Sequence, residues 1–320
     1  MLKVLVLGSA AGGGSPQWNC NSEVSKAVRS RTSGTSPRTQ SSIVVTANND
    51  EWFLFNASPD LGSQILNNSQ MHPKKGLRHS PISGVVLTNG DVDHVAGLLT
   101  LRERQNLSVY AHARVHSVLK ENSIFNVLNS DYVDRREMKM NVEFELKNKE
   151  GKGSGIFIEA FEVPGKIALW LEDESKGENF GTQEGDTIGL KISSAGKEKS
   201  FYYIPACAKM TSELSEKLKD SELVLFDGTL WKNDEMASSK VGEKTGQRMG
   251  HMNNSGPDGS IEAFKDLNVK KKIFIHINTT NPILLSDSNE RKIVEENNWE
   301  VSYDGMETVS YTHLTLPTSG

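Results

Sequence analysis

The chain has 320 residues, a formal net charge of −5 and 36% hydrophobic residues, a composition typical of globular proteins and not of disordered or fibrous ones. This net negative charge does not favour binding to nucleic acid. The opening "MLKVLVLGSAAGGG" has only four apolar residues in a row, too few for the apolar region of a signal peptide or for a membrane span. We therefore expect a cytoplasmic protein without nucleic-acid or membrane partners; its oligomeric state, a homodimer included, stays open.

Short apolar runs bounded by glycine, asparagine and proline predict strands along the chain. In order they are "KVLVLG", "SSIVVTA", "WFLFNA", "GVVLTN", "SVYAHA", "GIFIEAFEV", "TIGLKISS", "SFYYIPA", "LVLFDG" and "KIFIHI". Apolar periodicity predicts helices over Val95–Gln105, Val115–Glu121, Ser212–Lys219, Ile261–Leu267 and Glu290–Asn297.

The early strands follow one another closely, whereas helices separate the later ones, and this order favours two sheets with helices outside. The predicted fold is therefore α/β: a four-layer αββα sandwich of two mixed β-sheets flanked by helices. We expect one domain over residues 1–307 and a non-native tail over residues 308–320, so His313 is left out of the chemistry.

The first predicted strand runs into a glycine loop, "GSAAGGGSPQWNC". The loop lacks the lysine and hydroxyl residue of a P-loop, and its glycines do not give G-x-G-x-x-G. Pro16 disfavours an uninterrupted helix behind it. We expect a tight turn that lines a cleft, with Gln17, Trp18 and Asn19 contributing to one wall.

Two polar, glycine-rich segments, residues 30–41 and 232–259, show little hydrophobic periodicity. Loops of this length inside a compact domain tend to be functional or mobile.

The segment "TNGDVDHVAGLL" places Asp91 and Asp93 between a predicted strand and a predicted helix. Aspartates at a helix N-terminus are explained by capping alone, so two interpretations, a helix cap and a metal site, stand side by side. Asp227 and His276 lie at or near the ends of two later apolar strands, where α/β proteins place their chemistry. Several candidate ligands at strand ends favour the metal site.

The order of these elements resembles the metallo-β-lactamase superfamily, whose motif H-x-H-x-D-H follows a strand. Asn89 and Asp91 stand where the first two histidines would be, while Asp93 and His94 match. Residues 1–307 also resemble the pyrroloquinoline quinone (PQQ) biosynthesis protein B family. The segments that carry the resemblance include "LGSAAGGGSPQWNCN", "RTQSSI", "NASPDL", "LTNGDVDHVAGLLTLRE", "LFDGTLW", "TGQRMGHM" and "IFIHINTTNPIL". It implies the αββα sandwich and a motif that is altered in the whole family.

One departure from that family concerns cysteine. Its members often carry a cysteine cluster after "WNC" that looks like a structural zinc site, whereas this chain has Cys20 alone there and only Cys207 besides. A closed structural zinc site needs about four ligands. We therefore expect two free thiols, with Cys20 acting as a small buried residue.

Proteins of the superfamily have two metal positions, and the resemblance also implies which of the two keeps its ligands in this chain. "EVPGK" occupies the place of the superfamily's "GHTxG" histidine, so the first position keeps only Asn89 and Asp91, while the second keeps Asp93, His94 and, by resemblance, His276. Two histidines and one carboxylate with open positions are the arrangement of non-haem Fe(II) oxygenases. The expected cofactor is Fe(II), with zinc as the alternative.

The activity implied by the resemblance is hydroxylation, with dioxygen, of a tyrosine-derived precursor of PQQ that is a small molecule or short peptide. Two other classes stay open: a carrier of PQQ or its precursor, and a hydrolase with two zinc ions. The missing histidines of the first metal position argue against the hydrolase.

Further site residues are assigned by position. Asp227 is expected to orient a ligand, His251 to contact substrate or transfer a proton, and Asn89, Arg38 and Arg78 to contact substrate, the arginines through its carboxylates. A turn aspartate and a solvated loop histidine are equal alternatives for Asp227 and His251, and surface arginine is the default interpretation of Arg38 and Arg78. Asp91 is expected to be a helix cap or a weak ligand.

Overall fold

The computed structural model describes residues 2–177, 179–196 and 200–309. Its first sheet contains seven strands in the order β14-β1-β2-β3-β4-β5-β6. These strands are β1 (Lys3–Gly8), β2 (Ser42–Thr46), β3 (Trp52–Phe55), β4 (Ile82–Val86), β5 (Leu107–Ala111), β6 (Val133–Glu137) and β14 (Glu307–Val309).

The second sheet also contains seven strands, in the order β13-β12-β11-β10-β9-β8-β7. They are β7 (Glu143–Lys147), β8 (Gly153–Glu162), β9 (Ile188–Ser194), β10 (Ser200–Ile204), β11 (Leu223–Asp227), β12 (Lys271–Ile275) and β13 (Trp299–Val301). Both sheets are mixed: β3, β4, β5 and β6 pair in parallel, as do β10, β11, β12 and β13, and the remaining pairs are antiparallel.

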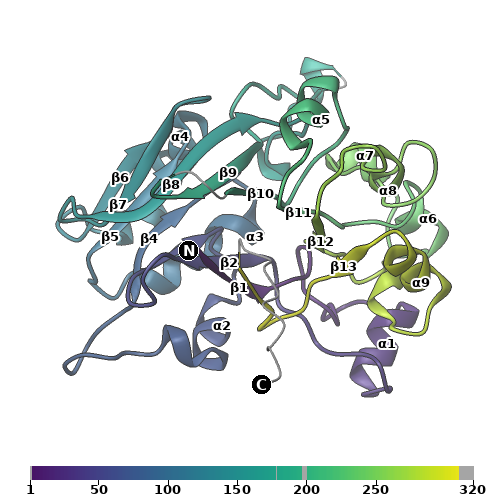
Figure 1. Cartoon of the computed structure of the whole chain (residues 1–320), viewed down its shortest axis with the longest axis horizontal. Helices are drawn as coiled ribbons and strands as arrows, with labels where there is room; N and C mark the ends of the chain where they lie inside the picture. Colours follow the sequence, from purple (N-terminus) through teal and green to yellow (C-terminus); the bar gives the residue numbers. More distant parts are fainter. Residues whose placement is uncertain (1, 178, 197–199, 310–320) are drawn as a thin grey trace, which may run out of the picture.

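Helices form the two outer layers (Figure 1). The α-helices are α1 (Glu23–Arg29), α2 (Leu61–Asn67), α3 (Val92–Val95), α4 (Ala113–Glu121), α5 (Ser212–Leu218), α6 (Glu235–Ser238), α7 (Gly246–Met249), α8 (Ser260–Ala263) and α9 (Asn289–Glu296). The 3₁₀ helices are η1 (Ser69–Met71), η2 (Ala96–Leu101), η3 (Ser123–Val127), η4 (Leu169–Leu171), η5 (Glu174–Lys176) and η6 (Pro282–Leu284). Within the described ranges, no helix has the length and apolar character that a membrane crossing requires.

Three apolar layers hold the sandwich together. Between the sheets, Phe55 of β3 and Phe201 of β10 belong to one buried cluster. A second cluster packs α2 and α4 on the outer face of the first sheet. A third packs α1, α5 and α9 on the outer face of the second sheet. Because each sheet buries both faces, the fold is the predicted αββα sandwich.

Two predicted boundaries differ from the structure. The helix predicted over Val95–Gln105 is instead the short α3 followed by η2, which ends at Leu101. The amide of Gly97 donates to the carbonyl of Ala57 (2.8 Å) and not within the helix, and a Cβ at Gly97 would lie 2.1 Å from the carbonyl oxygen of Ser58, so the close approach of this neighbouring backbone interrupts the α-helix. At the other end of the chain, Thr308 belongs to β14, which pairs with β1; residues 310–320 of the predicted tail lie outside the described residues.

The parallel strands β4, β11 and β12 place their carboxyl ends at one edge of the sandwich. Backbone hydrogen bonds join the two sheets there. The amide of Ala11 donates to the carbonyl of Ile277 (2.9 Å), and the amide of Ile188 donates to the carbonyl of Thr88 (3.0 Å). The loops after β1, β4, β11 and β12 therefore meet at this edge.

Candidate metal centre

The turn after β4 holds the ring of His94 in a defined orientation. The side-chain oxygen of Asn89 accepts the amide of Asp91 (3.0 Å) and lies 2.7 Å from Nδ1 of His94. Because that oxygen can only accept, Nδ1 of His94 carries the proton. Nε2 of His94 is then left with its lone pair, which is the form that binds a metal ion.

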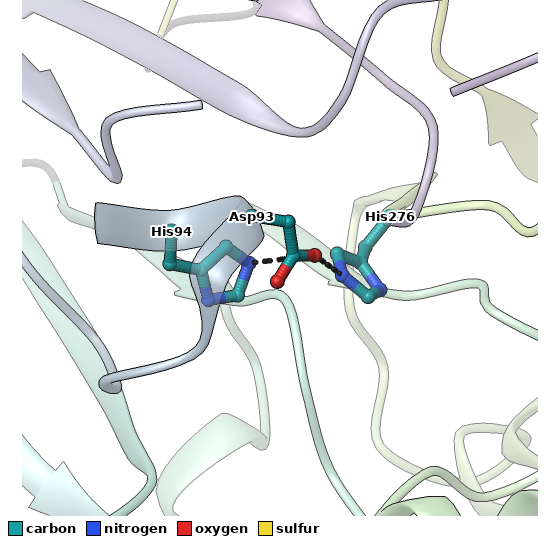
Figure 2. Close-up of side chains that lie close together, drawn as sticks. All are labelled: Asp93, His94 and His276. Atoms are coloured by element: carbon teal, nitrogen blue, oxygen red, sulfur yellow. Dashed lines mark hydrogen bonds and ion pairs between the residues drawn. The ribbon is translucent and has the colours of Figure 1, made fainter. Parts of the chain in front are cut away.

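Asp93, His94 and His276 form a compact cluster, with Asp93 between the two imidazoles (Figure 2). One ligand atom of each lies within 4.8 Å of the others. Oδ2 of Asp93 is 3.0 Å from Nε2 of His276 and 3.9 Å from Nε2 of His94. Nε2 of His94 is buried and has no hydrogen-bond partner among the described residues. A buried nitrogen without a partner, beside a carboxylate and a second imidazole, fits a metal ion.

The electrostatics of this cluster favour the ligand forms of two residues. Burial opposes ionisation of Asp93, but His94 and His276 outweigh it and hold the pKa of that carboxyl well below its usual range. Burial lowers the pKa of His94 to about 4. Burial also disfavours the charged form of His276, but its hydrogen bond to Asp93 outweighs this and raises its pKa. Asp93 is thus ionised and His94 neutral at neutral pH, as metal binding requires.

His276 occupies an unusual backbone conformation. It directly follows β12 and has a φ of 59°, in the left-handed region that side chains disfavour by roughly 1–2 kcal/mol. Its Nδ1 is 2.8 Å from the hydroxyl of Thr229, which donates its own proton to Asp227 (2.6 Å). Since the hydroxyl has one proton, it accepts from Nδ1 and leaves Nε2 directed at Asp93. Backbone strain of this kind clusters at functional sites.

A second group of potential ligands shares His276 and adds Asp227 and His251. Oδ2 of Asp227 is 2.7 Å from Nδ1 of His251 and also accepts the amide of Cys207 (2.9 Å). The rings of His251 and His276 stack with centroids 5.1 Å apart. Asp227 is fully buried, so the carboxylate fixes the orientation of His251 and, through Thr229, of His276.

Thr229 was missed by the sequence-based interpretation. Its position two residues after Asp227 in "LFDGTLW" gave a weak signal, because a hydroxyl residue in a turn after a strand usually bonds locally.

A cavity of about 320 Å³ opens over both groups. Its lining comprises Ala11, Gly12, Gln17, Asn89, Asp91, Asp93, His94, Lys166, Leu169, Thr187, Ala206, Thr229, Met236, Lys244, Met249, Gly250, His251, His276 and Asn278. Gln17 of the glycine loop thus contributes to the wall, whereas Trp18 is 86% exposed and, like Asn19, does not line the cavity. The polar segment 232–259 supplies Lys244 and His251.

Asp91 lies at the N-cap position of α3, but its side chain makes no capping hydrogen bond. Its carboxylate instead accepts the amide of Leu169 (3.0 Å), which ties the segment after β8 to the metal centre. Burial and the neighbouring Asp93 raise the pKa of Asp91. Asp91 lines the cavity yet belongs to neither ligand group.

The two arginines predicted to bind substrate do not reach the cavity, and this corrects the sequence-based prediction. Arg38 is buried and donates to the carbonyl of Ser302 (3.3 Å), so its guanidinium supports the chain between β13 and β14. Arg78 pairs with Glu103 (3.6 Å) on the surface. Because Arg78 precedes β4 and the cluster follows it, the two lie at opposite ends of that strand.

Comparison with known proteins agrees with this geometry. A family model described as the beta-lactamase superfamily domain matches residues 51–277. Coenzyme PQQ synthesis protein B of Rhodopseudomonas palustris (strain BisB5) is 48% identical over 308 residues, which cover 96% of this chain and 99% of that protein. The protein of the same name from Xanthomonas axonopodis pv. citri is 47% identical over 306 residues, with the same two shares. The chain belongs to the coenzyme PQQ synthesis protein B family.

Solved structures give the same family and fold. Zn(2+)-bound PqqB from Methylobacterium extorquens is 45% identical, with a TM-score of 0.90 over 96% of this chain and 99% of that one. A diphosphatase from the PhnP family is 18% identical with a TM-score of 0.66, over 97% and 98% of the two chains, and this likeness shows the fold alone. Family membership confirms the resemblance drawn from the motifs.

Proposed function

We propose that this protein acts in PQQ biosynthesis as a metal-dependent oxygenase that hydroxylates a tyrosine-derived precursor. The observation that carries the proposal is the Asp93–His94–His276 cluster beneath a cavity of about 320 Å³, in which Nε2 of His94 is buried and has no hydrogen-bond partner within the described ranges. Two histidines and one carboxylate are the donor set of non-haem Fe(II) oxygenases. Membership of the PQQ synthesis protein B family supports the pathway.

The same three residues suit zinc as well, and the Methylobacterium extorquens relative is described as Zn(2+)-bound. We propose Fe(II) for the active form because iron would activate dioxygen. Zinc has no redox chemistry and could not do so. Asn89 and Thr229 keep Nε2 of the two histidines free for the ion, and Asp93 contributes the carboxylate.

His251 is the residue best placed to move a proton. Its Nδ1–H is held by Asp227 (2.7 Å), so Nε2 is the basic atom, and His251 lines the cavity. A histidine oriented by a buried carboxylate is a suitable general base. We propose that Nε2 of His251 accepts the phenolic proton of the substrate, while Leu169, Met236 and Met249 contact the ring.

The test is oxygen consumption by the metal-loaded protein. Metal-free protein is loaded anaerobically with Fe(II), and tyrosine-containing peptides and a reductant are added before oxygen. Hydroxylation places one oxygen atom on the ring and releases the other as water, so two electrons must come from the reductant. We expect peptide-dependent oxygen uptake and a product heavier by one oxygen atom.

Zinc-loaded protein is the matched control, since it keeps the ligands and the cavity but should consume no oxygen. Fe(II)-loaded protein whose oxygen uptake does not change on adding any peptide would contradict the oxygenase. Cleaved peptide in the zinc-loaded sample would favour a hydrolase.

A further inference from the structure

A second hollow opens at the edge of the sandwich opposite the metal centre. β4 and β5 begin there, whereas the candidate ligands Asp93 and His94 follow the other end of β4. The hollow has a volume of about 280 Å³ and shares no lining residue with the cavity over the metal centre. Its apolar lining comes from the first sheet and the helices that cover it, and includes Ile65, Met71, Ile82, Leu101 and Leu107.

Exposed apolar side chains gather around this hollow. Leu77, in the loop between η1 and β4, lines it and is fully exposed. Leu66 of α2, next to Ile65 of the lining, is 74% exposed. Val127 of η3 is also exposed and lines a second hollow that adjoins the first. Apolar side chains that are exposed together beside a hollow are typical of a binding surface.

The adjoining hollow is lined mainly by arginine. It has a volume of about 410 Å³, and Arg78 and Glu103 line both hollows. The carboxylate of Glu103 is 3.6 Å from Arg78 and 3.7 Å from Arg102, so it offsets only part of their charge. Arg104, which also lines this hollow, has no ion pair or side-chain hydrogen bond within residues 2–177, 179–196 and 200–309.

The charge of this region is opposite to that of the whole chain. Residues 72–80 and 99–106 contain five lysines and arginines and one glutamate, whereas the formal net charge of the chain is −5. An apolar hollow therefore lies beside a positively charged one. The ligand that complements both has apolar and anionic groups side by side.

We propose that the two adjoining hollows form one docking groove for an acidic segment of a partner protein. An apolar side chain of the segment fills the first hollow against Leu77, and its carboxylates bind Arg78 and Arg104. Arginine binds carboxylates through paired hydrogen bonds, and the buried apolar side chain supplies much of the affinity. The groove lies at the end of β4 away from the metal centre, so docking leaves the cavity there open, and the inference does not rest on the proposed function.

The groove also gives Arg78 a role of the chemistry that the sequence suggested. That prediction paired Arg78 with the carboxylates of a substrate, but the structure places it far along β4 from the cavity. In the docking groove the same guanidinium, which is 75% exposed, binds carboxylates of a protein segment instead.

A second copy of this chain and a membrane fit the docking groove less well. Two copies related by a two-fold axis would bring the same arginines face to face. A flat anionic membrane could contact Leu77, but it would leave both hollows unfilled and would repel the carboxylate of Glu103. A flexible acidic segment can enter the concave groove and place its carboxylates beside the arginines.

The experiment uses a fluorescein-labelled synthetic peptide of aspartate, glutamate and leucine, with the leucines at every third or fourth position. In one control peptide serine replaces leucine, and in the other asparagine and glutamine replace the acids. Affinities for the full-length protein are measured by fluorescence polarisation. We expect the probe to bind about 10-fold more tightly than either control peptide, and its preference over the amide peptide to fall at high salt.

Substitutions in the groove should remove these preferences separately. L77S should bring the affinities for the leucine and serine peptides close together, because it removes an apolar contact. R104Q should reduce the preference for the acidic peptide about 3-fold, and R78Q combined with R104Q should bring it near parity. These side chains are exposed, so the variants should fold as the wild type does.

R31Q is the matched control for R104Q. Arg31 is exposed, lies outside both hollows and has a φ of 53°, close to the 56° of Arg104. The substitution therefore changes the net charge and the strained backbone position equally. I293S is the control for L77S, because Ile293 is exposed on α9, away from the groove. Both controls should keep the wild-type preferences.

Equal affinities of the wild type for all three peptides, or equal losses in R104Q and R31Q, would overturn the docking groove. Sedimentation would detect a dimer, and a dimer that L77S abolishes would assign the groove to a second copy. Binding to phosphatidylserine vesicles without binding of the peptide would assign it to a membrane. Either result would contradict the proposed partner.

Discussion

Asp91 and Asp93 are two residues apart, but their side chains have different partners. Asp93 faces the imidazoles of His94 and His276, whereas Asp91 accepts the amide of Leu169. The turn therefore separates a candidate metal ligand, Asp93, from a residue that holds the neighbouring loop, Asp91.

This difference predicts how metal binding responds to substitution. D93A and H276A should each abolish tight binding, because they remove one of three ligands. D91A should lower the affinity about 10–100-fold, the usual cost of losing a supporting contact. Metal content after dialysis and competition with a chelator measure these effects. Two tightly bound ions per chain, lost together in D91A, would contradict the single site and support a two-metal hydrolase.

Cys20 provides a second test at a single residue. It is 8% exposed, its sulfur accepts the amide of Ser22 (3.4 Å), and it is a free thiol. A serine hydroxyl can accept the same hydrogen bond, so C20S should leave metal content unchanged and lower the free energy of unfolding by less than about 1 kcal/mol. Urea unfolding and metal analysis measure both.

C207S is the control for that substitution. Cys207 is fully buried, and burial raises the pKa of its thiol to about 12. A serine hydroxyl can still donate to the carbonyl of Lys209, as the thiol does (3.3 Å), but it is more polar in a fully buried position, so C207S should cost about 1 kcal/mol. Loss of tightly bound zinc in C20S would show that Cys20 is a ligand after all.

Some of these site residues can be predicted from the sequence and others cannot, for a physical reason. Asp93, His94, Asp227 and His276 lie at or just after the ends of apolar strands, so their place at one edge of the sandwich is predictable. The role of Thr229 depends on which of several nearby atoms its single proton reaches, and spacing does not determine that. The same limit applies to the arginines, since a long side chain can be turned away from a site that its backbone approaches.

At the scale of elements, α6 and the loop after β12 are joined by Glu235. This carboxylate accepts the amide of Trp231 (2.6 Å) and the hydroxyl of Thr280. Thr280 lies four residues after His276, so Glu235 stabilises the loop that carries this candidate ligand.

Glu235 predicts a pH dependence of stability. Burial raises the pKa of its carboxyl from 4.5 to about 7, so the folded state binds the proton more tightly than the unfolded state does. The resulting stabilisation is fully present below about pH 4.5 and is lost as pH rises through 7, a loss of roughly 3 kcal/mol. E235Q keeps an acceptor for Trp231 but cannot titrate. Its free energy of unfolding, measured in urea, should therefore fall less than that of the wild type between about pH 5 and 8. Identical pH profiles would contradict this role.

The strands that the sequence did not predict are edge strands. β6, "VDRRE", and β7, "EFELK", lie at the same end of their sheets, where one side of the strand faces solvent. Charged residues are favoured on edge strands because they discourage pairing with other chains. In β6 and β7 these residues interrupt the alternation of apolar and polar side chains from which a strand is predicted. β13 and β14 have three residues each, too few for a pattern.

At the scale of the whole molecule, the chain returns to its first sheet at the end. β13 closes the second sheet and β14 joins β1 of the first, so residues 302–306 cross between the sheets. Asp304 fixes this crossing: Oδ1 accepts the amide and hydroxyl of Ser9, and Oδ2 accepts the amide and hydroxyl of Thr39. The order of the predicted strands along the chain indicated two sheets, one after the other. It did not indicate that the end of the chain pairs with β1, because this depends on residues about 300 positions apart.

D304A should destabilise the protein by about 2–4 kcal/mol, because it leaves the buried amide of Ser9 and the amide of Thr39 without an acceptor, while the Thr39 hydroxyl keeps the carbonyl of Leu7 (3.2 Å). D304N should have a smaller effect, since one of its two side-chain positions still accepts. Urea unfolding followed by tryptophan fluorescence measures both. A D304A midpoint equal to that of the wild type would show that the crossing is held by other contacts.

The left-handed backbone conformation of His276 is strained at the position whose imidazole we propose to bind the metal ion. Glycine adopts a φ of 59° without strain, but glycine carries no imidazole, and Asp93 and His94 alone make a poor site. Replacing the histidine would also remove its hydrogen bond to Asp93 (3.0 Å), so relief of the backbone strain would cost both this pair and the candidate metal site. Substitutions intended to stabilise this protein should therefore be made far from residue 276.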